Sequence, residues 1–276
     1  MEVAQLQALA TQVRRDILRM VHAVQSGHPG GSLGCTDFLV ALYFEVMQHQ
    51  PQAFDMDAKN QDAFFLSNGH VSPVFYSVLA RSGYFPIAEL GSFRKLNSRL
   101  QGHPTTHEHL PGVRIASGSL GQGLSVACGA ALSKKINKEQ GTYVYALLGD
   151  GELNEGLVWE AAMSAAHYKL GNLTAIIDFN GLQIDGKNDD VMAVKPVDKK
   201  FESFGWNVIL VDGHDMTALM AAFEAAKQVT DKPTVLLAST VKGKGVSFME
   251  NQVGWHGKAP SDDELAAALK ELGGDK

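Results

Sequence analysis

The sequence predicts an α/β fold in which a doubly wound, mostly parallel sheet carries helices on both faces. Two observations lead to this prediction: short apolar strand segments recur along the chain, and helix-like segments separate them. The composition is that of an ordinary globular protein, with 45% hydrophobic and 20% charged residues among 276. Because α/β domains often exceed 200 residues, we expect residues 1–276 to form one domain.

Five segments are predicted to be strands because each is short and mostly apolar, as expected for a parallel strand that is covered on both faces. They are residues 63–67, 143–148, 173–179, 206–211 and 234–240. Helix-like stretches lie between them, and 155–168 and 216–229 are clear examples. Such alternation is typical of parallel β-α-β units.

Capping residues and apolar spacing predict further helices. Ser72 followed by Pro73 indicates a helix start, with serine as the N-cap and proline in the first turn. Ser261 and Glu264 form a capping box ahead of an apolar run near the C-terminus. Apolar residues near the N-terminus repeat at helical spacing, unlike a signal peptide: Leu6, Leu9, Val13, Ile17, Met20 and Val24.

Charge and cysteine content exclude several classes of protein. The net charge of −6 argues against a nucleic-acid partner, because phosphate binding needs clustered lysines and arginines. Cys35 and Cys128 form no CxxC pair, so neither a disulfide framework nor a thiolate zinc site is expected. The sequence has no run of about 18 apolar residues, so we expect no membrane span and a cytoplasmic location.

Two polar residues follow two of the predicted strands, at the point where each strand ends. Asp150 stands between two glycines after strand 143–148, and Asn180 follows strand 173–179. The carboxyl ends of parallel strands meet at one edge of a sheet, so these two side chains are placed to converge. A carboxylate and an amide oxygen suit Mg²⁺ or Ca²⁺ better than zinc.

The surroundings of Asp150 favour a diphosphate as the second partner of such a metal. Mg²⁺ prefers few protein ligands and completes its octahedron with phosphate oxygens and water. Gly149 and Gly151 let the backbone approach those phosphates closely. The helix that begins near Glu155 adds N–H groups and partial positive charge at its N-terminus. The sequence therefore predicts a metal–diphosphate site.

The segment from Asp150 to Asn180 resembles the signature of thiamine diphosphate enzymes, which starts with GDG and ends in Asn. Other segments are similar, in the same order, to the N-terminal half of transketolase. They are SGHPGGSLG (26–34), SNGH (67–70), GHP (102–104), GSLGQGLS (118–125), GDGELNEG (149–156) and WHGKAP (255–260). The resemblance covers almost the whole chain. It implies the diphosphate-binding module of the transketolase family, with thiamine diphosphate and Mg²⁺ or Ca²⁺ as cofactors.

The resemblance also implies roles for particular residues. Asp150, Asn180 and the backbone carbonyl of Leu182 match the metal ligands of the family. Residues that match positions around the cofactor are His70, Gly118, Leu120, Gly149, Gly151 and His256. Catalytic histidines that move protons or recognise sugar hydroxyls are matched by His28, His103 and His256, together with His70; a pKa near 7 would suit them. Glu155 and Glu160 match acidic residues that link the two cofactor sites of a dimer.

The implied reaction is the transfer of a two-carbon ketol unit from a ketose to an aldose, either of which can carry phosphate, as in the pentose phosphate pathway. Enzymes of the family continue with a pyrimidine-binding module, which supplies the glutamate that activates the cofactor. We therefore expect this chain to join a separate C-terminal subunit in an α₂β₂ heterotetramer, which is active only when both chains are present. The capped helix near the end of the sequence fits this expectation.

Two other functions stay open on the sequence alone. One is the α-type subunit of another two-chain thiamine diphosphate enzyme that acts on 2-oxo acids, which the segments SGHPG and WHGKAP disfavour. The other is a non-catalytic binding protein that kept the cofactor fold. The intact metal residues and histidines argue against it.

Several local features depart from the family or suggest other sites. Gly31-Ser32 and Arg114 differ from the common family pattern, which bears on the preferred sugar. His107 and His109 form a possible metal pair, although no third ligand is suggested nearby. The loop that starts at Lys242 (KGKG) lacks Walker spacing and precedes no clear helix, so a nucleotide hydrolase is disfavoured.

Overall fold

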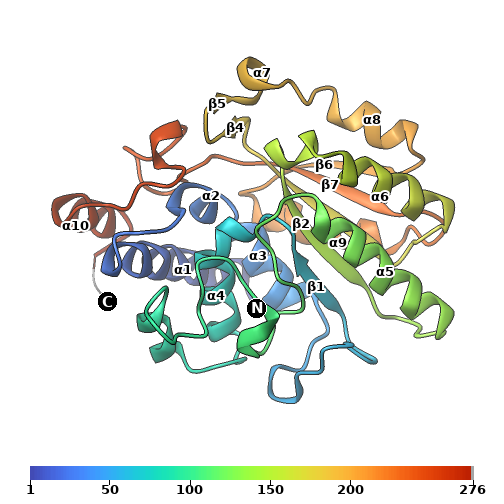
Figure 1. The fold of residues 1–276 in the computed structure, drawn as a ribbon, viewed down its shortest axis with the longest axis horizontal. Coiled ribbons are helices and arrows are strands. Elements are labelled where there is room, and N and C mark those ends of the chain that lie inside the picture. Colours follow the sequence, from blue (N-terminus) through green and yellow to red (C-terminus); the bar gives the residue numbers. More distant parts are fainter. Residues whose placement is uncertain (275–276) are drawn as a thin grey trace.

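A five-stranded parallel sheet with the order β1-β2-β3-β7-β6 forms the centre of the computed structural model, which describes residues 1–274 (Figure 1). Its strands are β1 (Ala63–Leu66), β2 (Val144–Gly149), β3 (Leu173–Phe179), β6 (Asn207–Asp212) and β7 (Thr234–Ser239). All five predicted strands are confirmed, and no end differs by more than one residue.

Helices pack on both faces of this sheet. The α-helices of residues 1–274 are α1 (Val3–Ala23), α2 (Pro29–Gly34), α3 (Thr36–Ala41), α4 (Ser72–Arg81), α5 (Gln122–Ile136), α6 (Gly156–His167), α7 (Asn188–Val191), α8 (Val197–Ser203), α9 (Met216–Lys227) and α10 (Asp262–Glu271). The helices predicted at the N-terminus, after Ser72, between the strands and near the C-terminus are confirmed.

The alternation of side chains along each strand divides the core into two layers. Tyr145 and Leu147 of β2 join a cluster with the first four helices and α9, whereas Ala146 and Leu148 join a second cluster with α5, α6 and α8. Strands β1, β2, β3 and β7 are therefore buried along almost their whole length because helices cover both of their faces, whereas edge strand β6 is partly exposed. The predicted doubly wound architecture is confirmed.

Helix ends show one success and one error of the sequence prediction. Ser261 caps α10 as predicted, since its side chain accepts from the Glu264 N–H and the Glu264 side chain accepts from the Ser261 N–H. Ser72 is not an N-cap, because Val71 holds that position. The Ser72 hydroxyl donates instead to the Gly102 carbonyl, 2.7 Å away, and so holds the 102–104 loop against α4.

A small hairpin that the sequence did not reveal follows β3. Strands β4 (Leu182–Gln183) and β5 (Gly186–Lys187) pair antiparallel and lead directly into α7. With two residues in each strand, the hairpin is too short to show an alternating pattern in the sequence. Figure 1 shows it at the carboxyl edge of the main sheet.

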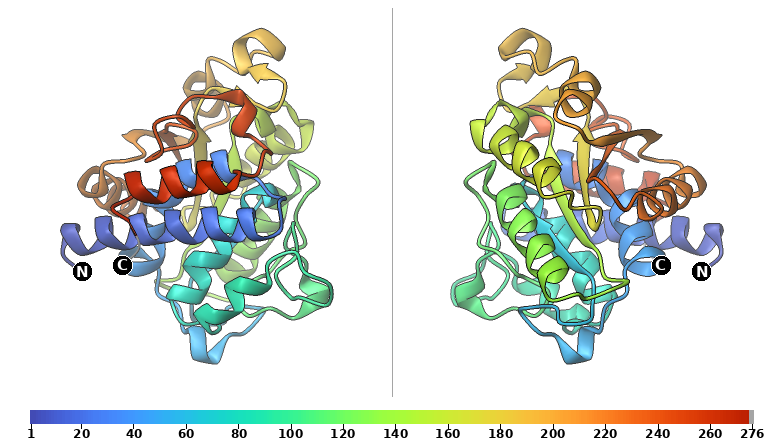
Figure 2. Two further views of the ribbon diagram at one scale, coloured as in Figure 1. Left: turned by 90° about the vertical axis from the view of Figure 1, so that its left-hand side faces the viewer. Right: turned by 90° about the vertical axis from the view of Figure 1, so that its right-hand side faces the viewer.

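Helix α10 returns to the N-terminal part of the fold and packs along α1 (Figure 2). The Asp262 carboxylate at the start of α10 lies 2.8 Å from His22 Nε2 on α1. Among the helices of residues 1–274, not one combines the length and apolar character that crossing a bilayer requires.

Replacing Ser261 by alanine removes the cap of α10. We expect Ser261→Ala to lower the free energy of unfolding by about 1 kcal/mol, measured by urea denaturation. Ser203→Ala in α8 is the matched control: its exposed hydroxyl donates to the carbonyl of Lys199 within the same helix, and the change should stay within about 0.5 kcal/mol. Equal losses in the two variants would contradict the assigned cap.

Candidate functional site

A pocket of about 260 Å³ opens at the carboxyl edge of the sheet. Ten residues that the sequence singled out line it: His70, His103, Gly118, Leu120, Gly149, Asp150, Gly151, Asn180, Leu182 and His256. His28 lies beside them, with ring centroids 5.3 Å from His70 and 5.4 Å from His256. The structure therefore brings together all the predicted residues except Glu155 and Glu160.

Parallel topology explains this convergence. His70 follows β1, Asp150 follows β2, Asn180 follows β3 and Lys242 follows β7. In the sheet register, Gly149 pairs with Asp178 and Asp178 pairs with Ala238, so the strands end at the same level. Residues from four distant parts of the sequence reach one pocket because their strands share one direction.

The Asp150 carboxylate joins the ends of β2 and β3. It is 2% exposed and accepts hydrogen bonds from the N–H groups of Gly151 at 2.8 Å and Gly181 at 2.5 Å. Burial, with a contribution from the negative charge of Asp178, raises the pKa of Asp150 to about 6. A cation bound at Asp150 would relieve both effects.

Asp178 is a site residue that sequence reasoning missed. Its buried carboxylate accepts from Asn180 Nδ2 at 2.9 Å and from the Thr240 hydroxyl. Because the Asn180 amide nitrogen is held in this way, Asn180 Oδ1 is the atom left to accept, and it takes the Leu182 N–H at 2.9 Å. The alternate residues of β3 point to opposite faces, which is the sequence feature that could have placed Asp178 next to Asn180.

The donor set fits a hard divalent cation. Asp150, Asn180 and the Leu182 carbonyl offer one carboxylate, one amide and one backbone oxygen, which is the oxygen chemistry that Mg²⁺ and Ca²⁺ prefer. Residues 1–274 contain no group of three or more His, Cys, Asp or Glu side chains placed to hold a metal. The predicted set has only one such side chain, so this absence does not test it, and the cation site stays a prediction.

Lys242 is a second site residue that the sequence analysis did not place here. It is 2% exposed, and its ammonium group donates to the Leu182 carbonyl at 3.1 Å and to His256 Nδ1 at 2.9 Å. Because an ammonium group only donates, Nδ1 of a neutral His256 accepts and its Nε2 carries the proton. The KGKG loop is the available clue, but its glycines suggest only a nucleotide loop.

Hydrogen bonds to His214, and through it to Asp37 and Arg14, hold the backbone next to Lys242. The Val241 N–H donates to His214 Nε2 at 2.8 Å, which leaves His214 Nδ1 to donate to the Asp37 carboxylate at 2.7 Å. Arg14 binds the same carboxylate through both terminal nitrogens, at 2.6 and 3.0 Å. This buried chain of contacts fixes the position from which the Lys242 side chain enters the pocket.

Four histidines cluster in the pocket, and the neutral form is favoured in each. Burial is the largest cause: it lowers the pKa of His28 to about 4, with help from Arg94, and that of His256 to about 3, with help from Lys242. It also lowers the pKa of His103 and, more strongly, of His70. The expectation of a pKa near 7 is therefore wrong for these side chains in the unliganded pocket.

Glu152 connects three of the chain segments next to the pocket, at Ser67, Gly121 and Gly149. Its buried carboxylate accepts from the Gly121 N–H at 2.7 Å, from the Gly149 N–H at 3.0 Å and from the Ser67 hydroxyl. The Ser67 oxygen in turn accepts from the Gly123 N–H at 3.0 Å. An added Cβ at Gly123 would lie 2.4 Å from Ser67 Cβ, so the loops meet too closely for any other residue.

Comparison with known proteins shows the family of the chain. The family model described as "Transketolase, thiamine diphosphate binding domain" matches residues 6–276. The chain is 39% identical over 269 residues to one of the subunits of apulose-4-phosphate transketolase from Actinobacillus succinogenes, covering 97% of this chain and 96% of that protein. It is 41% identical over 273 residues to the transketolase of Homo sapiens, covering 97% of this chain and 42% of that protein.

The chain belongs to the transketolase family.

Solved structures agree with this assignment. The crystal structure of transketolase from Campylobacter jejuni superposes with a TM-score of 0.92 at 33% identity, covering 100% of this chain and 44% of that one. The chain thus spans less than half of the single-chain transketolases, but nearly the whole length of relatives named as subunits. A further such relative is the 6-deoxy-6-sulfo-D-fructose transketolase subunit SqwG from a Clostridium species, at 37% identity and 96% of its length.

Two residues that match the transketolase pattern lie outside the pocket. Glu155 occupies the N-cap position of α6 without a side-chain capping bond, and Glu160 lies one turn further along the same helix. Both side chains are exposed. The structure thus places this acidic pair on the exposed side of α6 and not among the residues that line the pocket.

The departures from the transketolase pattern also fall outside the pocket, with one exception. Arg114 donates to the carbonyls of Asp55 and Met56 and lies over the Phe54 ring, 4.6 Å from its centroid. It therefore fastens a surface loop. Gly31 does line the pocket, and an added Cβ there would lie 3.9 Å from His70 Nε2.

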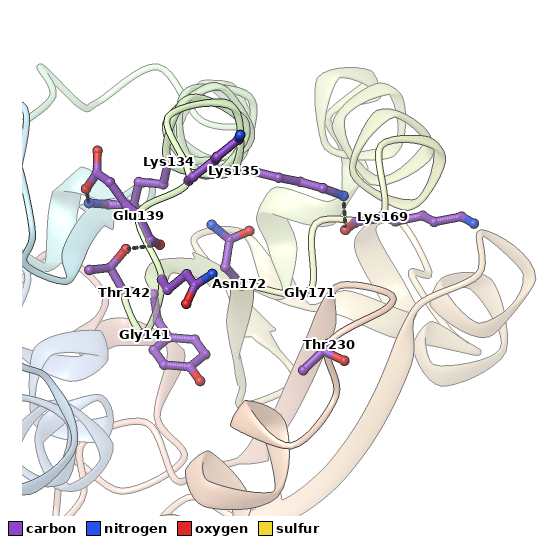
Figure 3. A pocket seen from close by; sticks show the side chains of 12 residues that line it. Lys134, Lys135, Glu139, Gly141, Thr142, Lys169, Gly171, Asn172 and Thr230 are labelled. Carbon is purple, nitrogen blue, oxygen red and sulfur yellow. Dashed lines mark hydrogen bonds and ion pairs between the residues drawn. The ribbon is translucent and has the colours of Figure 1, made fainter.

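A second hollow, of about 420 Å³, lies at the opposite edge of the sheet, where β2 and β3 begin (Figure 3). Two of its four lysines already have partners within the protein. Lys134 donates to the Ala58 carbonyl and to Glu139, and Lys135 donates to the carbonyls of Tyr168 and Lys169. None of the predicted site residues lines this hollow.

Loss of the Glu152 carboxylate should loosen all three loops at once. We expect Glu152→Ala to lower the free energy of unfolding by roughly 2–4 kcal/mol, because buried N–H and hydroxyl groups lose their acceptor. Urea denaturation of the variant measures this loss. Glu160→Ala removes an exposed carboxylate of the same type and should change stability by less than about 0.5 kcal/mol. A Glu152→Ala variant as stable as the control would refute the role of Glu152.

The lowered pKa of His256 predicts a pH-dependent stability. Between pH 6.5 and about 3 the unfolded chain binds a proton at this histidine that the folded chain does not, so the free energy of unfolding falls as the pH falls. His256→Gln should therefore lose roughly 1–3 kcal/mol less than the wild type between pH 7 and 4.5. Urea denaturation at pH 7 and at pH 4.5 tests this. His167→Gln, which replaces an exposed histidine on α6, is the control. Parallel losses in wild type and His256→Gln would contradict it.

Proposed function

We propose that this chain is the cofactor-holding subunit of a two-chain transketolase. It would transfer a two-carbon ketol unit from a ketose to an aldose, with thiamine diphosphate and a divalent cation as cofactors. The observation that carries the proposal is the pocket at the carboxyl edge of the sheet, where Asp150 and Asn180 meet three histidines and His28 lies beside them. The near-complete match to relatives named as subunits supports the division into two chains.

The cofactor would be held by residues at the strand ends. Asp150, Asn180 and the Leu182 carbonyl would bind Mg²⁺ or Ca²⁺, and Lys242 would add positive charge beside the diphosphate. Residues proposed to surround the diphosphate and the thiazolium are His70, Gly118, Leu120, Gly149, Gly151 and His256. When bound, thiamine diphosphate supplies an electron sink for the carbon–carbon bond change.

The histidines of this chain would bind the sugar and move its protons. The ring centroid of His28 lies 6.0 Å from that of His103 and 5.4 Å from that of His256. Since the neutral form of these rings is favoured, His28 and His103 each have one nitrogen that can accept and one that can donate, whereas Nδ1 of His256 already accepts from Lys242. Such groups can exchange protons with sugar hydroxyls without first losing one to solvent.

A second chain would complete the site. We propose that residues 1–276 act as one cofactor-binding domain, and that a separate C-terminal subunit brings the pyrimidine-binding module and the glutamate that activates the cofactor. The assembly would be α₂β₂, with exposed Glu155 and Glu160 linking the two sites across α6. A cytoplasmic location and a role in the pentose phosphate pathway remain predictions of the sequence.

The substrate would be a sugar or sugar phosphate. The subunit relatives carry names that refer to apulose-4-phosphate and to 6-deoxy-6-sulfo-D-fructose, so related chains with this fold act on different ketoses. A donor screen of ketose phosphates against 2-oxo acids separates the proposed reaction from the 2-oxo acid alternative. Turnover of 2-oxo acids alone would refute the transketolase assignment.

Reconstitution tests the two-chain proposal directly. The purified chain should show no ketol transfer alone, and mixing it with the C-terminal subunit should restore transfer from ketose to aldose. Asp150→Asn should reduce the reconstituted activity by at least about a hundredfold, because a neutral amide binds a divalent cation poorly. Asp189→Asn, at an exposed carboxylate paired with Lys195, is the control and should leave activity unchanged.

Ketol transfer by the chain alone would show that it needs no partner. Full activity of the reconstituted Asp150→Asn variant would favour the alternative of a cofactor fold whose metal site is unused.

A further inference from the structure

Two carboxamide side chains in the pocket have polar atoms with no hydrogen-bond partner in residues 1–274. Asn68 is 1% exposed, and neither its Nδ2 nor its Oδ1 has a partner. Gln183 has a buried Nε2 in the same condition. Both residues line the pocket. Nearly all buried polar groups in folded proteins are hydrogen-bonded, so these atoms call for an explanation.

The two side chains lie beside the two glycines that flank Asp150, Asn68 next to Gly149 and Gln183 next to Gly151. An added Cβ at Gly149 would lie 3.9 Å from Asn68 Nδ2, and one at Gly151 would lie 3.2 Å from Gln183 Cβ. The backbone N–H of Asn68 bonds to the Leu147 carbonyl of β2, and Gln183 belongs to the β4–β5 hairpin. Both residues are therefore fixed in place by their backbones while their amide groups are left without protein partners.

We propose that Asn68 and Gln183 are two further ligand-binding residues, which bind the metal-bound diphosphate from either side of Asp150. The inference rests on the proposed function. Asn68 Nδ2 and Gln183 Nε2 would donate to diphosphate oxygens, and Asn68 Oδ1 would accept from a water molecule of the cation. These contacts satisfy all three unpartnered atoms with one ligand.

The charge of the pocket explains why amides suit these positions. Lys242 is the one lysine or arginine among the described residues that line the pocket, and it faces the carboxylates of Asp150 and Asp178. A divalent cation and Lys242 already offset most of the charge of a diphosphate ester. Carboxamides add N–H donors without adding charge, so they can hold the diphosphate without competing with the cation for its oxygens.

If Asn68 and Gln183 had only a structural role, replacing them would destabilise the unliganded protein. A structural carboxamide has partners in the unliganded protein, as Gln61 does: it is 7% exposed, its Nε2 donates to the Ala53 carbonyl and its Oε1 accepts from the Gln50 N–H. Replacing Gln61 should therefore destabilise the chain. Replacing Asn68 or Gln183 by an apolar side chain of similar shape should not, because it removes an unsatisfied buried group.

The test compares the variants Asn68→Leu, Gln183→Met and, as a matched control, Gln61→Met. Thermal unfolding of the unliganded chain gives stability. Isothermal titration with thiamine diphosphate and Mg²⁺, and separately with inorganic pyrophosphate and Mg²⁺, gives affinity, first for the chain alone and then for the chain mixed with the C-terminal subunit.

We expect Asn68→Leu and Gln183→Met to melt at or above the wild-type temperature and to bind both ligands about tenfold more weakly, as lost hydrogen bonds to a charged group require. Gln61→Met should melt lower and keep the wild-type affinity. Weaker binding of pyrophosphate as well as of thiamine diphosphate assigns the lost contacts to the diphosphate end.

Wild-type affinity in both Asn68→Leu and Gln183→Met, or a lowered melting temperature of the unliganded variants with unchanged affinity, would overturn the inference and leave the proposed function standing. If the wild type binds thiamine diphosphate in neither preparation, the proposed function fails and the inference fails with it.

Discussion

Burial of three carboxylates at the carboxyl edge of the sheet is the constraint on which the site depends. Asp150, Glu152 and Asp178 are each less than 4% exposed, and each is held by N–H or hydroxyl donors from loops that follow different strands. A buried carboxylate without such donors would be strongly destabilising, so the loops are positioned as much by these acids as by apolar packing. The same arrangement concentrates negative charge where a cation can be bound.

The outline of the fold and the central pair of the site could be predicted from the sequence. The five strands are short apolar runs between turns, and the rule that parallel strands end at one edge is enough to place Asp150 and Asn180 together. Both inferences use local patterns with a fixed geometric meaning. The hairpin β4–β5 could not be predicted because strands of two residues carry no pattern.

The remaining parts of the site depend on contacts between residues far apart in the sequence. Lys242 lies in a loop whose glycines suggest only a nucleotide loop, and its contacts with Leu182 and His256 are what show that it belongs to the pocket. Glu152 follows the GDG motif by one residue, yet its importance comes from Ser67 and Gly121. The histidine pKa values could not be predicted for the same reason, because residue type gives the ordinary value and burial sets the shift.

The contact between Lys242 and His256 has a consequence for the direction in which protons can move. With Nδ1 occupied by the ammonium group, the only N–H of the neutral ring points away from Lys242. The neutral ring of His256 therefore presents a hydrogen-bond donor to the pocket, and its Nδ1 is not free to take a proton. A lysine buried against a histidine thus fixes the tautomer of that ring and the polarity of the atom that it turns toward the pocket.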